Sequence, residues 1–309
     1  MKKRNLLLVL LAAMLTVPSL LFASGSSEKV AEKKEVSICT PYLSSVTTKQ
    51  MIGDIEEKLI ASGFSVSIND SANDNSRLVS DIETSVVSGA SAIIIVSVDP
   101  KIVETQINEA ADAGVPVFGC DAGYIDSMQM NASSDNYQMG EMISKYLFDK
   151  MEGSGKIVHL TYRPHPGVVQ RTYAMEDVLK KNQNVTLISE HHVDVPNQIN
   201  NSKEIVENLL TAYPEKGSIN AVLCAWDEPA IGATQALQEA GRDEVLVVGV
   251  DGNEQAVKLI NEGTNFKATL AQDFEGMADL VAVEVTKVLN GESVEKGEKY
   301  VPALLIEKE

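Results

Sequence analysis

Residues 92–121 have the sequence AIIIVSVDPKIVETQINEAADAGVPVFGCD. The first seven of them form a continuous run rich in Ile and Val, which predicts a strand buried on both faces. A segment of helical period follows, opened by Pro100 and ended by Gly114, and the run Val115 to Cys120 predicts the next strand. A strand, a helix and a second strand in this order are the repeating unit of a parallel sheet that helices cover.

The same alternation of apolar runs and helical segments extends over most of the chain. It restarts after Ser133 to Asn136, a polar stretch that divides the runs into two sets. We therefore expect an α/β fold with two doubly wound parallel-sheet lobes rather than one long sheet. The predicted strands cover residues 36–40, 64–69, 92–98, 115–120, 156–162, 185–191, 219–225, 245–250 and 266–270. The predicted helices cover residues 47–62, 73–88, 100–113, 137–151, 168–181, 198–212, 228–240 and 274–289, and a further helix starts at 253.

Length and composition agree with two folded lobes. The chain has 309 residues, of which 44% are hydrophobic, 23% charged and 5% aromatic. These proportions exclude a disordered chain, a collagen-like chain and a small disulfide-stapled protein. The formal net charge of −18 argues against nucleic acid as a partner, because phosphate binding needs clustered Lys and Arg.

The first 23 residues have the pattern of a secretory signal peptide. Basic residues at positions 2–4 precede the apolar run Leu6 to Val17, which is shorter than the roughly 20 residues of a membrane-spanning helix. Cleavage after residues 1–23 would remove three basic and no acidic residues, which takes the formal charge from −18 to about −21. Residues 24–34 predict a flexible leader, and no Cys follows the apolar run to accept a lipid. We expect an exported protein in the periplasm.

Three cysteines remain, Cys39, Cys120 and Cys224, and each closes a strand-like apolar run. An odd number at widely separated strand ends favours buried free thiols over a disulfide. No CxxC or Cys/His metal spacing is present, and His191-His192 would point to opposite faces of a strand. We expect neither a metal nor a cofactor.

Polar and aromatic residues follow the predicted strands where ligands bind in open parallel sheets, outside the carboxyl ends of the strands. Carboxylates accept hydrogen bonds from hydroxyls, and aromatic faces cover the C–H patches of a sugar ring, so this set suits a polyhydroxylated ligand. The residues at these ends are Tyr42, Ser44, Ser45, Thr47, Thr48, Asp121, Tyr124, Tyr162, Arg163, His165, Trp226, Asp227, Glu228, Asp251 and Gln272.

Some of these residues have a purely structural alternative. Asp251, which precedes Gly252-Asn253, could be a helix N-cap, and a single Trp such as Trp226 often packs in a core. Trp226 lies at a strand-to-helix turn, which favours the ligand cleft. Arg171 lies in the predicted helix 168–181, either as a surface arginine or as a donor aimed across the cleft from the first turn.

Enzyme motifs are absent: the chain has no GxSxG, no GxGxxG after a strand and no Walker loop. Residues 153–156, GSGK, precede a strand and predict a tight turn rather than a phosphate site. Asp227 and Glu228 could serve as the acid and base of a glycoside hydrolase. Adjacent carboxylates at a helix start are more often charges that favour the helix terminus, so we expect no enzyme.

Six motifs in this chain are residues 88–95 (SGASAIII), 113–117 (AGVPV), 134–136 (SDN), 227–233 (DEPAIGA), 248–252 (VGVDG) and 268–272 (ATLAQ). Together they resemble the periplasmic sugar-binding proteins of the ribose- and galactose-binding type, the receptors of ABC importers. The resemblance runs from Val36 to the end of the chain and implies the fold of type I periplasmic binding proteins.

The resemblance also implies four ligand contacts. Asp121 matches the family's sugar-binding aspartate after the fourth strand, and Arg171 matches its helix arginine. Asp251 matches the aspartate of the C-terminal lobe, and Gln272 matches the hinge glutamine. With the strand-end residues added, the predicted ligand contacts are Ser45, Thr47, Thr48, Asp121, Tyr124, Arg171, Trp226, Asp227, Asp251 and Gln272.

Three places depart from the ribose-type pattern. The Asn and the Phe pair after the first strand are replaced near Ser45, Thr47 and Thr48. The Arg that usually follows the fourth-strand Asp is Ala122, and the Asn before Asp-Glu is Trp226. One aromatic wall is removed and another supplied, so a different pentose, a hexose, a polyol or another small hydroxylated ligand fits as well as D-ribose.

The family's architecture implies three hinge crossings, which fall near Asp135, Gln272 and Pro302. The implied N-terminal lobe comprises residues 35–135 and 272–302, and the implied C-terminal lobe comprises residues 136–271 and 303–309.

The resulting expectation is a monomeric receptor that captures a small sugar or polyol by hinge closure, without chemistry, and delivers it to an ABC transporter permease. The closed form could also be recognised by a chemoreceptor. A receptor for a nucleoside or a signalling molecule is the alternative with the same fold. LacI-type repressors share this fold too, but they need an N-terminal helix-turn-helix where this chain has an export signal.

Overall fold

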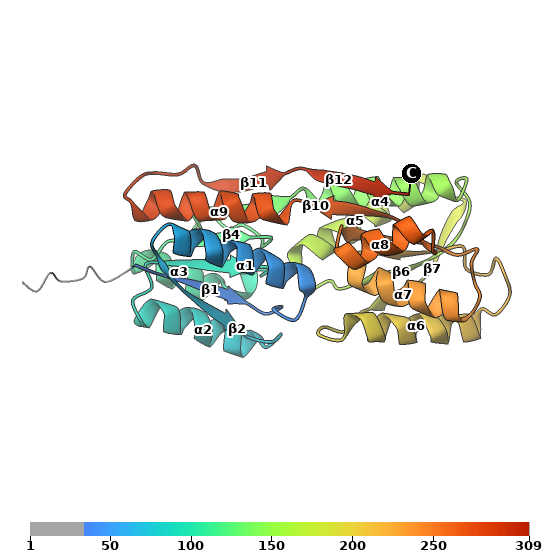
Figure 1. Ribbon diagram of the computed structural model, residues 1–309, viewed down its shortest axis with the longest axis horizontal. Helices are drawn as coiled ribbons and strands as arrows, with labels where there is room; N and C mark the ends of the chain where they lie inside the picture. Colours follow the sequence, from blue (N-terminus) through green and yellow to red (C-terminus); the bar gives the residue numbers. More distant parts are fainter. Residues whose placement is uncertain (1–33, 309) are drawn as a thin grey trace, which may run out of the picture. The chain divides into compact units, whose positions relative to one another are not determined.

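The computed structural model describes residues 34–308, so the predicted signal peptide and residues 24–33 of the leader lie outside the described residues. Two six-stranded sheets, each covered by helices on both faces, make up this part of the chain (Figure 1). The predicted α/β class with two doubly wound sheets is confirmed. No helix among residues 34–308 combines the length and the hydropathy that a membrane crossing requires.

All six strands of the first sheet run parallel, in the order β11-β5-β4-β3-β1-β2. Helices α1 and α9 cover one face, and α2 and α3 cover the other. The strands are β1 (Glu35–Thr40), β2 (Ser65–Asp70), β3 (Ala92–Val96), β4 (Val117–Cys120), β5 (Met130–Ser134) and β11 (Gly297–Val301). The helices are α1 (Val46–Ala61), α2 (Asn75–Val87), the 3₁₀ turn η1 (Pro100–Val103), α3 (Glu104–Asp112) and α9 (Phe274–Leu289).

The second sheet has the order β12-β10-β9-β8-β6-β7, with β12 antiparallel to β10 and the other pairs parallel. Helices α4 and α5 cover one face, and α6, α7 and α8 cover the other. Its strands are β6 (Gly155–Thr161), β7 (Val185–His192), β8 (Ala221–Cys224), β9 (Leu246–Asp251), β10 (Phe266–Gln272) and β12 (Ala303–Glu307). Its helices are α4 (Asn136–Lys150), α5 (Pro166–Lys181), α6 (Gln198–Ala212), α7 (Asp227–Glu239) and α8 (Glu254–Glu262).

The chain passes from one sheet to the other three times: between β5 and α4, between β10 and α9, and between β11 and β12. Asp135 and Asp273 occupy the first two passages and cap the helices that follow, because their carboxylates accept the backbone N–H groups of Gln138 and Gly276. Pro302 occupies the third passage. The first two passages are therefore short segments held by the helices that they enter.

Three strands were not predicted from the sequence: β5, β11 and β12. The sequence of β5, MNASS, has no β-branched residue, although all five of its residues are buried between β4 and β11. Strands β11 and β12 lie at sheet edges and are half-buried, so they lack a continuous apolar run. The predicted helix 100–113 is divided, because Val103 leaves helical geometry with φ −122° and ψ 24°.

Phe118 in β4 is completely buried in the core between the first sheet and helices α1 and α9. We expect Phe118→Ala to lower the free energy of unfolding by about 3–5 kcal/mol, because the truncation leaves a cavity. Urea unfolding followed by circular dichroism measures this loss. The control is Val87→Ala on α2, where the side chain is 87% exposed, and it should change the same quantity by less than about 0.5 kcal/mol. Equal losses in the two variants would contradict the core described for the first sheet.

Candidate functional site

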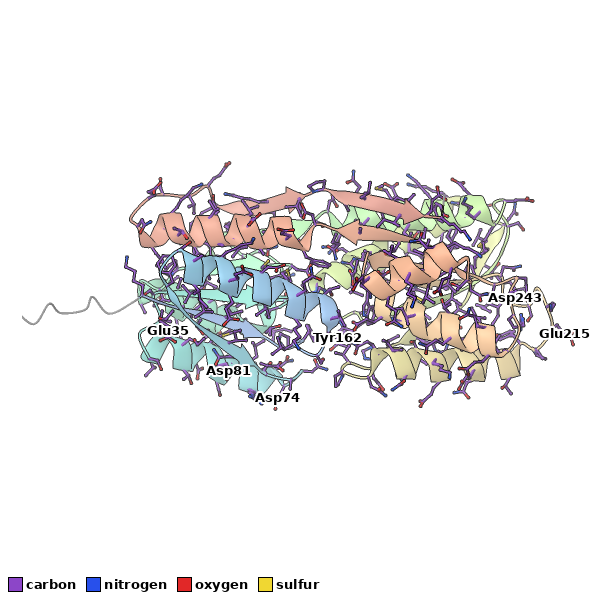
Figure 2. All side chains as sticks on the ribbon, in the orientation of Figure 1. Glu35, Asp74, Asp81, Tyr162, Glu215 and Asp243 are labelled. Atoms are coloured by element: carbon purple, nitrogen blue, oxygen red, sulfur yellow. The ribbon has the colours of Figure 1, made fainter. Side chains whose placement is uncertain are left out.

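A pocket lies between the carboxyl ends of the two sheets and is lined by residues that follow strands of both. It encloses about 500 Å³ with its opening to solvent included. Figure 2 shows Tyr162, which follows β6, at the junction between the elements of the two sheets. The lining residues are Tyr42, Ser45, Thr47, Thr48, Asp121 and Phe274 from the first sheet's side, and Tyr162, His165, Val168, Arg171, Val195, Gln198, Trp226, Glu228 and Asp251 from the second.

The structure brings most of the predicted contacts together at this pocket and leaves three outside its lining. Tyr124 packs against the core on the α2 and α3 face of the first sheet. Asp227 and Gln272 are buried. Asp227 accepts the backbone N–H of Asn253, and Gln272 donates to the carboxylate of Asp251. The predicted contacts that line the pocket are Ser45, Thr47, Thr48, Asp121, Arg171, Trp226 and Asp251.

The two pocket aspartates occupy equivalent places in the two sheets. Strands β4 and β9 are each third in their sheet, and both lead through Gly-X-Asp, in VFGCD and VVGVD, to Asp121 and Asp251. Both aspartates have positive φ, 50° for Asp121 and 126° for Asp251, which L residues rarely adopt. Such backbone geometry persists only where the surrounding structure enforces it, and it is common at binding sites.

A glycine two residues before each aspartate makes room for a polar side chain that fixes the turn. A Cβ on Gly119 would lie 2.5 Å from Oδ1 of Asn131. Asn131 uses that oxygen to accept the N–H of Ala122, at 3.2 Å, and its Nδ2 donates to the carbonyl of Ala122 at 2.8 Å. The amide of Asn131 therefore holds the residue that follows Asp121.

Asp227 has the same function in the second sheet. A Cβ on Gly249 would lie 2.4 Å from its Oδ1. That oxygen accepts the hydroxyl of Thr269 at 2.7 Å, and Oδ2 accepts the N–H of Asn253 at 2.9 Å. Burial and the charge of Asp251 raise the pKa of Asp227 well above its usual range. Its carboxyl group therefore positions the turn after Asp251 and is not a wall of the pocket.

Asp121 faces His165 across the pocket. Oδ2 of Asp121 accepts the hydroxyl of Ser97 at 3.2 Å and lies 3.6 Å from Nε2 of His165. Oδ1 of Asp121 is buried and has no hydrogen-bond partner among the described residues. The aspartate follows β4 of the first sheet, and the histidine caps α5 of the second, so this pair spans the two sides.

Arg171 and Asp251 form a buried pair within the second side. Nη1 of Arg171 lies 3.4 Å from Oδ1 of Asp251 and donates to the carbonyl of Ala225 at 2.8 Å, while Nε donates to Oδ1 of Asn136 at 2.8 Å. Gln272 donates from Nε2 to the same oxygen of Asp251 at 2.8 Å. Asp251 thus receives hydrogen bonds from a helix and from the end of β10.

Two predictions about these residues need correction. Helix α5 begins at Pro166 rather than at Val168, so Arg171 lies in its second turn and not in its first. Its guanidinium group is buried against its own side of the pocket instead of extending across it. The alternative that Asp251 is an N-cap is also wrong, because Asn253 caps α8 by accepting the N–H of Ala256.

Aromatic rings enclose one end of the pocket. Trp226 is 8% exposed and meets Tyr162 edge to face, with ring centroids 6.5 Å apart. Tyr162 also meets Tyr42 edge to face at 5.9 Å, and their hydroxyls lie 3.4 Å apart. Trp226 therefore packs against a neighbouring ring and also lines the pocket. It combines the two roles that the sequence offered as alternatives, core packing and a place in the cleft.

Further contacts join the two sides at the rim. The hydroxyl of Ser45 donates to Oε2 of Glu228 at 3.1 Å. The hydroxyl of Tyr162 donates to Asn73 at 2.9 Å, and Nδ2 of Asn73 donates to the carbonyl of Val195 at 3.3 Å. Because each contact joins a residue of the first side to one of the second, the described arrangement is closed around the pocket.

Several lining residues were not among the predicted contacts. Tyr42, Tyr162, His165 and Glu228 follow strands, and this position alone was the signal for them. Gln198 and Phe274 begin helices α6 and α9, and nothing in their local sequence marks them.

Other predicted features are placed away from the pocket. Arg163 turns outward to Glu176 and Glu190. The three cysteines are buried free thiols, as predicted. No group of three or more potential metal ligands occurs within residues 34–308.

Burial is the main cause that raises the pKa of Asp251 to about 7, and the nearby Arg171 and the amide of Gln272 oppose the shift. The unfolded carboxyl group has its ordinary pKa of 3.8, so the folded state holds a proton between these values that the unfolded state releases. Wild-type stability should therefore fall as pH rises from 4 to 7, by at most about 1.4 kcal/mol per pH unit from this group. We expect the free energy of unfolding of Asp251→Asn, relative to wild type, to rise over this interval and to level off above it. Urea unfolding at a series of pH values measures the difference.

Asp177 supplies a control of opposite sign, because Lys180 and Tyr137 lower its pKa. The stability that Asp177 contributes is present above its ordinary pKa and is lost as pH falls. Relative to wild type, Asp177→Asn should therefore lose stability as pH rises through about 4. The raised pKa of Asp251 would be contradicted if the difference in free energy of unfolding between wild type and Asp251→Asn stayed constant from pH 4 to 8.

The family model described as "Periplasmic binding protein domain" matches residues 36–293. The chain is similar to the ribose import binding protein of Bacillus subtilis, with 29% identity over 247 residues that cover 78% of this chain and 77% of that protein. It is similar to the xylitol-binding protein of Mycolicibacterium smegmatis, with 25% identity over 285 residues that cover 91% of this chain and 80% of that protein.

Among solved structures, the chain is similar to an ABC transporter solute binding protein from Agrobacterium vitis with bound allitol. The TM-score is 0.84 at 28% identity, and the match covers 89% of this chain and 96% of that one. An ABC sugar transporter subunit from Rhodobacter sphaeroides gives the same TM-score of 0.84 at 27% identity, over 89% of this chain and 98% of that one. The motifs, the two-sheet fold and the family match agree, and the chain belongs to the periplasmic binding protein family.

Proposed function

We propose that this protein is an extracytoplasmic receptor that captures a small sugar or polyol between its two sheets and delivers it to an ABC-type permease. The pocket carries this proposal, because it combines carboxylates and hydroxyls from both sides with enclosing aromatic rings. Carboxylates are strong acceptors for ligand hydroxyls, and rings cover apolar C–H patches. The proposed function is capture and release, and the ligand leaves unchanged.

The two sides of the pocket would move as lobes. We assign residues 35–135 and 272–302 to one lobe and residues 136–271 and 303–308 to the other, with hinges at the three passages between the sheets. Opening would break the contacts that join the sides, such as Ser45 to Glu228. A ligand favours the closed form only as far as its contacts differ between the two forms. Contacts to both sides at once supply that difference.

The pocket residues divide into those that face the ligand and those that hold them. Asp121 and Asp251 accept hydrogen bonds from ligand hydroxyls, and Arg171 holds Asp251 and donates from its remaining N–H groups. Gln272 and Asp227 are positioning residues, because one fixes the Asp251 carboxylate and the other fixes the turn behind it.

The ligands named for the relatives support a small polyhydroxylated molecule. They are ribose and xylitol for the two similar receptors and allitol for the similar solved structure. Relative to the ribose-type pattern, Trp226 replaces an Asn and Ala122 replaces an Arg. Both replacements favour a ligand other than D-ribose.

The structure does not support the carboxylate pair, Asp227 and Glu228, on which the glycoside hydrolase alternative depends. Asp227 has no exposed surface and is hydrogen-bonded to Thr269 and Asn253. Of these two carboxylates, only Glu228 lines the pocket. A general acid and a base must both reach the glycosidic bond, and Asp227 cannot do so.

We further propose that the protein acts in the periplasm as a monomer, after export and removal of residues 1–23. The permease is the partner that the family implies, and a chemoreceptor is the second protein that we propose binds the closed form.

A thermal-shift screen against sugars, polyols and nucleosides tests the proposed function. Ligand at 100 times its Kd should add about 2.7 kcal/mol to the free energy of unfolding. For the ligand found, Asp251→Ala should weaken binding by about 1.5–3 kcal/mol, which is roughly 10- to 150-fold in Kd, because a charged hydrogen-bond partner is lost. Calorimetric titration measures Kd.

The control is Asp126→Ala, whose side chain is exposed and outside the pocket lining, and it should bind like wild type. A flat response across the whole library would refute the proposal. Stabilisation by nucleosides alone would favour the nucleoside receptor, and turnover of a glycoside would favour the hydrolase.

A further inference from the structure

The side chains that line the pocket carry an excess of negative charge. Three of them are carboxylates, Asp121, Glu228 and Asp251, and the one Lys or Arg among them is Arg171. Arg171 is already engaged with Asp251, Asn136 and a backbone carbonyl. Within residues 34–308, no Lys or Arg pairs with the carboxylate of Asp121 or Glu228. A buried charge without a partner is costly, so the pocket favours a ligand that is positively charged.

His165 does not supply the missing positive charge. Its Nδ1 accepts the N–H groups of Gly167 and Val168, at 3.1 and 3.3 Å, and thereby caps α5. A protonated imidazole has no acceptor nitrogen and could not form this cap. In this arrangement Nδ1 serves as the acceptor of the cap, and Nε2 is the ring atom that faces Asp121, at 3.6 Å.

Asp121 is the carboxylate with the least compensation. Glu228 lies in the first turn of α7, where the helix terminus favours a negative charge. Asp121 follows a strand, and the ring of His165 stands between it and the first N–H groups of α5. The side chain of Asp121 is only 9% exposed, and its Oδ1 is buried without a hydrogen-bond partner in the described chain.

The pocket lacks donors rather than acceptors. Two buried side-chain atoms of its lining have no partner in the described chain, Oδ1 of Asp121 and Oε1 of Gln198, and both are acceptors. An ammonium group offers three N–H donors together with a positive charge. Aromatic rings attract cations to their faces, and Trp226, Tyr42 and Tyr162 supply three such rings to the lining.

We propose that the ligand of this pocket carries a cationic amino group beside its hydroxyls, as an amino sugar or amino polyol does, and that Asp121 binds this group. The inference rests on the proposed function and specifies its ligand class. Arg171 and Asp251 then bind the hydroxyl end of the ligand, at the other side of the pocket.

Matched sets of three compounds test this inference by calorimetric titration of the protein. Each set contains a neutral sugar or polyol, its amino-deoxy analogue and the N-acetylated amine, for example galactose, galactosamine and N-acetylgalactosamine, or sorbitol and its 1-amino-1-deoxy and N-acetyl analogues. In at least one set, the amine should bind at least tenfold more tightly than the neutral compound. Acetylation, which removes the charge, should abolish that advantage.

Two variants locate the amino group. Asp121→Asn keeps the shape of the side chain and removes its charge, so the amine should lose its preference over the neutral compound, whatever loss of affinity the two compounds share. Glu228→Gln should reduce the preference less, because the helix terminus already compensates Glu228. Asp126→Asn, at an exposed position outside the pocket lining, should leave both affinities unchanged.

The outcomes separate the inference from the proposed function. Neutral compounds that bind as tightly as their amines in every set would overturn the inference and leave the sugar or polyol receptor intact. No binding by any member of any set would count against the proposed function itself. An amine preference that survives Asp121→Asn would overturn the role of Asp121.

Discussion

Burying a carboxylate is costly unless its neighbours supply hydrogen bonds or opposite charge, and the second half of this protein is organised around that constraint at Asp251. Arg171 and Gln272 both meet its Oδ1. Gln272 ends β10 beside one passage between the sheets, and Arg171 also holds Asn136, which begins α4 beside another. Two of the three passages are therefore connected to the floor of the pocket through a single carboxylate oxygen.

The same design occurs twice, once in each sheet. A strand ends in Gly-X-Asp, and the glycine leaves room for a buried polar side chain that pins the next turn. In the first sheet that side chain is Asn131, and in the second it is Asp227. The neutral amide needs no further compensation, whereas Asp227 adds another acid beside Asp251. The two halves share a backbone plan and differ in charge.

Sequence alone predicted the elements whose own residues determine them. The run of Ile and Val in β3 is buried on both faces, so its composition and its place agree. Strand β5 has no such composition, because its pairing with β4 and β11 stabilises it. In the pocket, Asp121 and Asp251 could be predicted because parallel strands bring their carboxyl ends together. Gln198 and Phe274 could not, because the packing of α6 and α9 brings them there. The positioning role of Asp227 depends on the space above Gly249, which no local pattern reveals.

The buried thiols have a practical consequence. Cys39, Cys120 and Cys224 have no exposed surface, and burial raises the pKa of each thiol. Thiolates rather than thiols react with maleimides, so the native cysteines would not react with maleimide dyes in the folded protein. A single cysteine introduced beside the first passage, in place of an exposed side chain such as Tyr137, would be the one labelled position. A fluorophore there would convert the proposed movement of the two halves into an optical signal, and the receptor into a sensor for its own ligand.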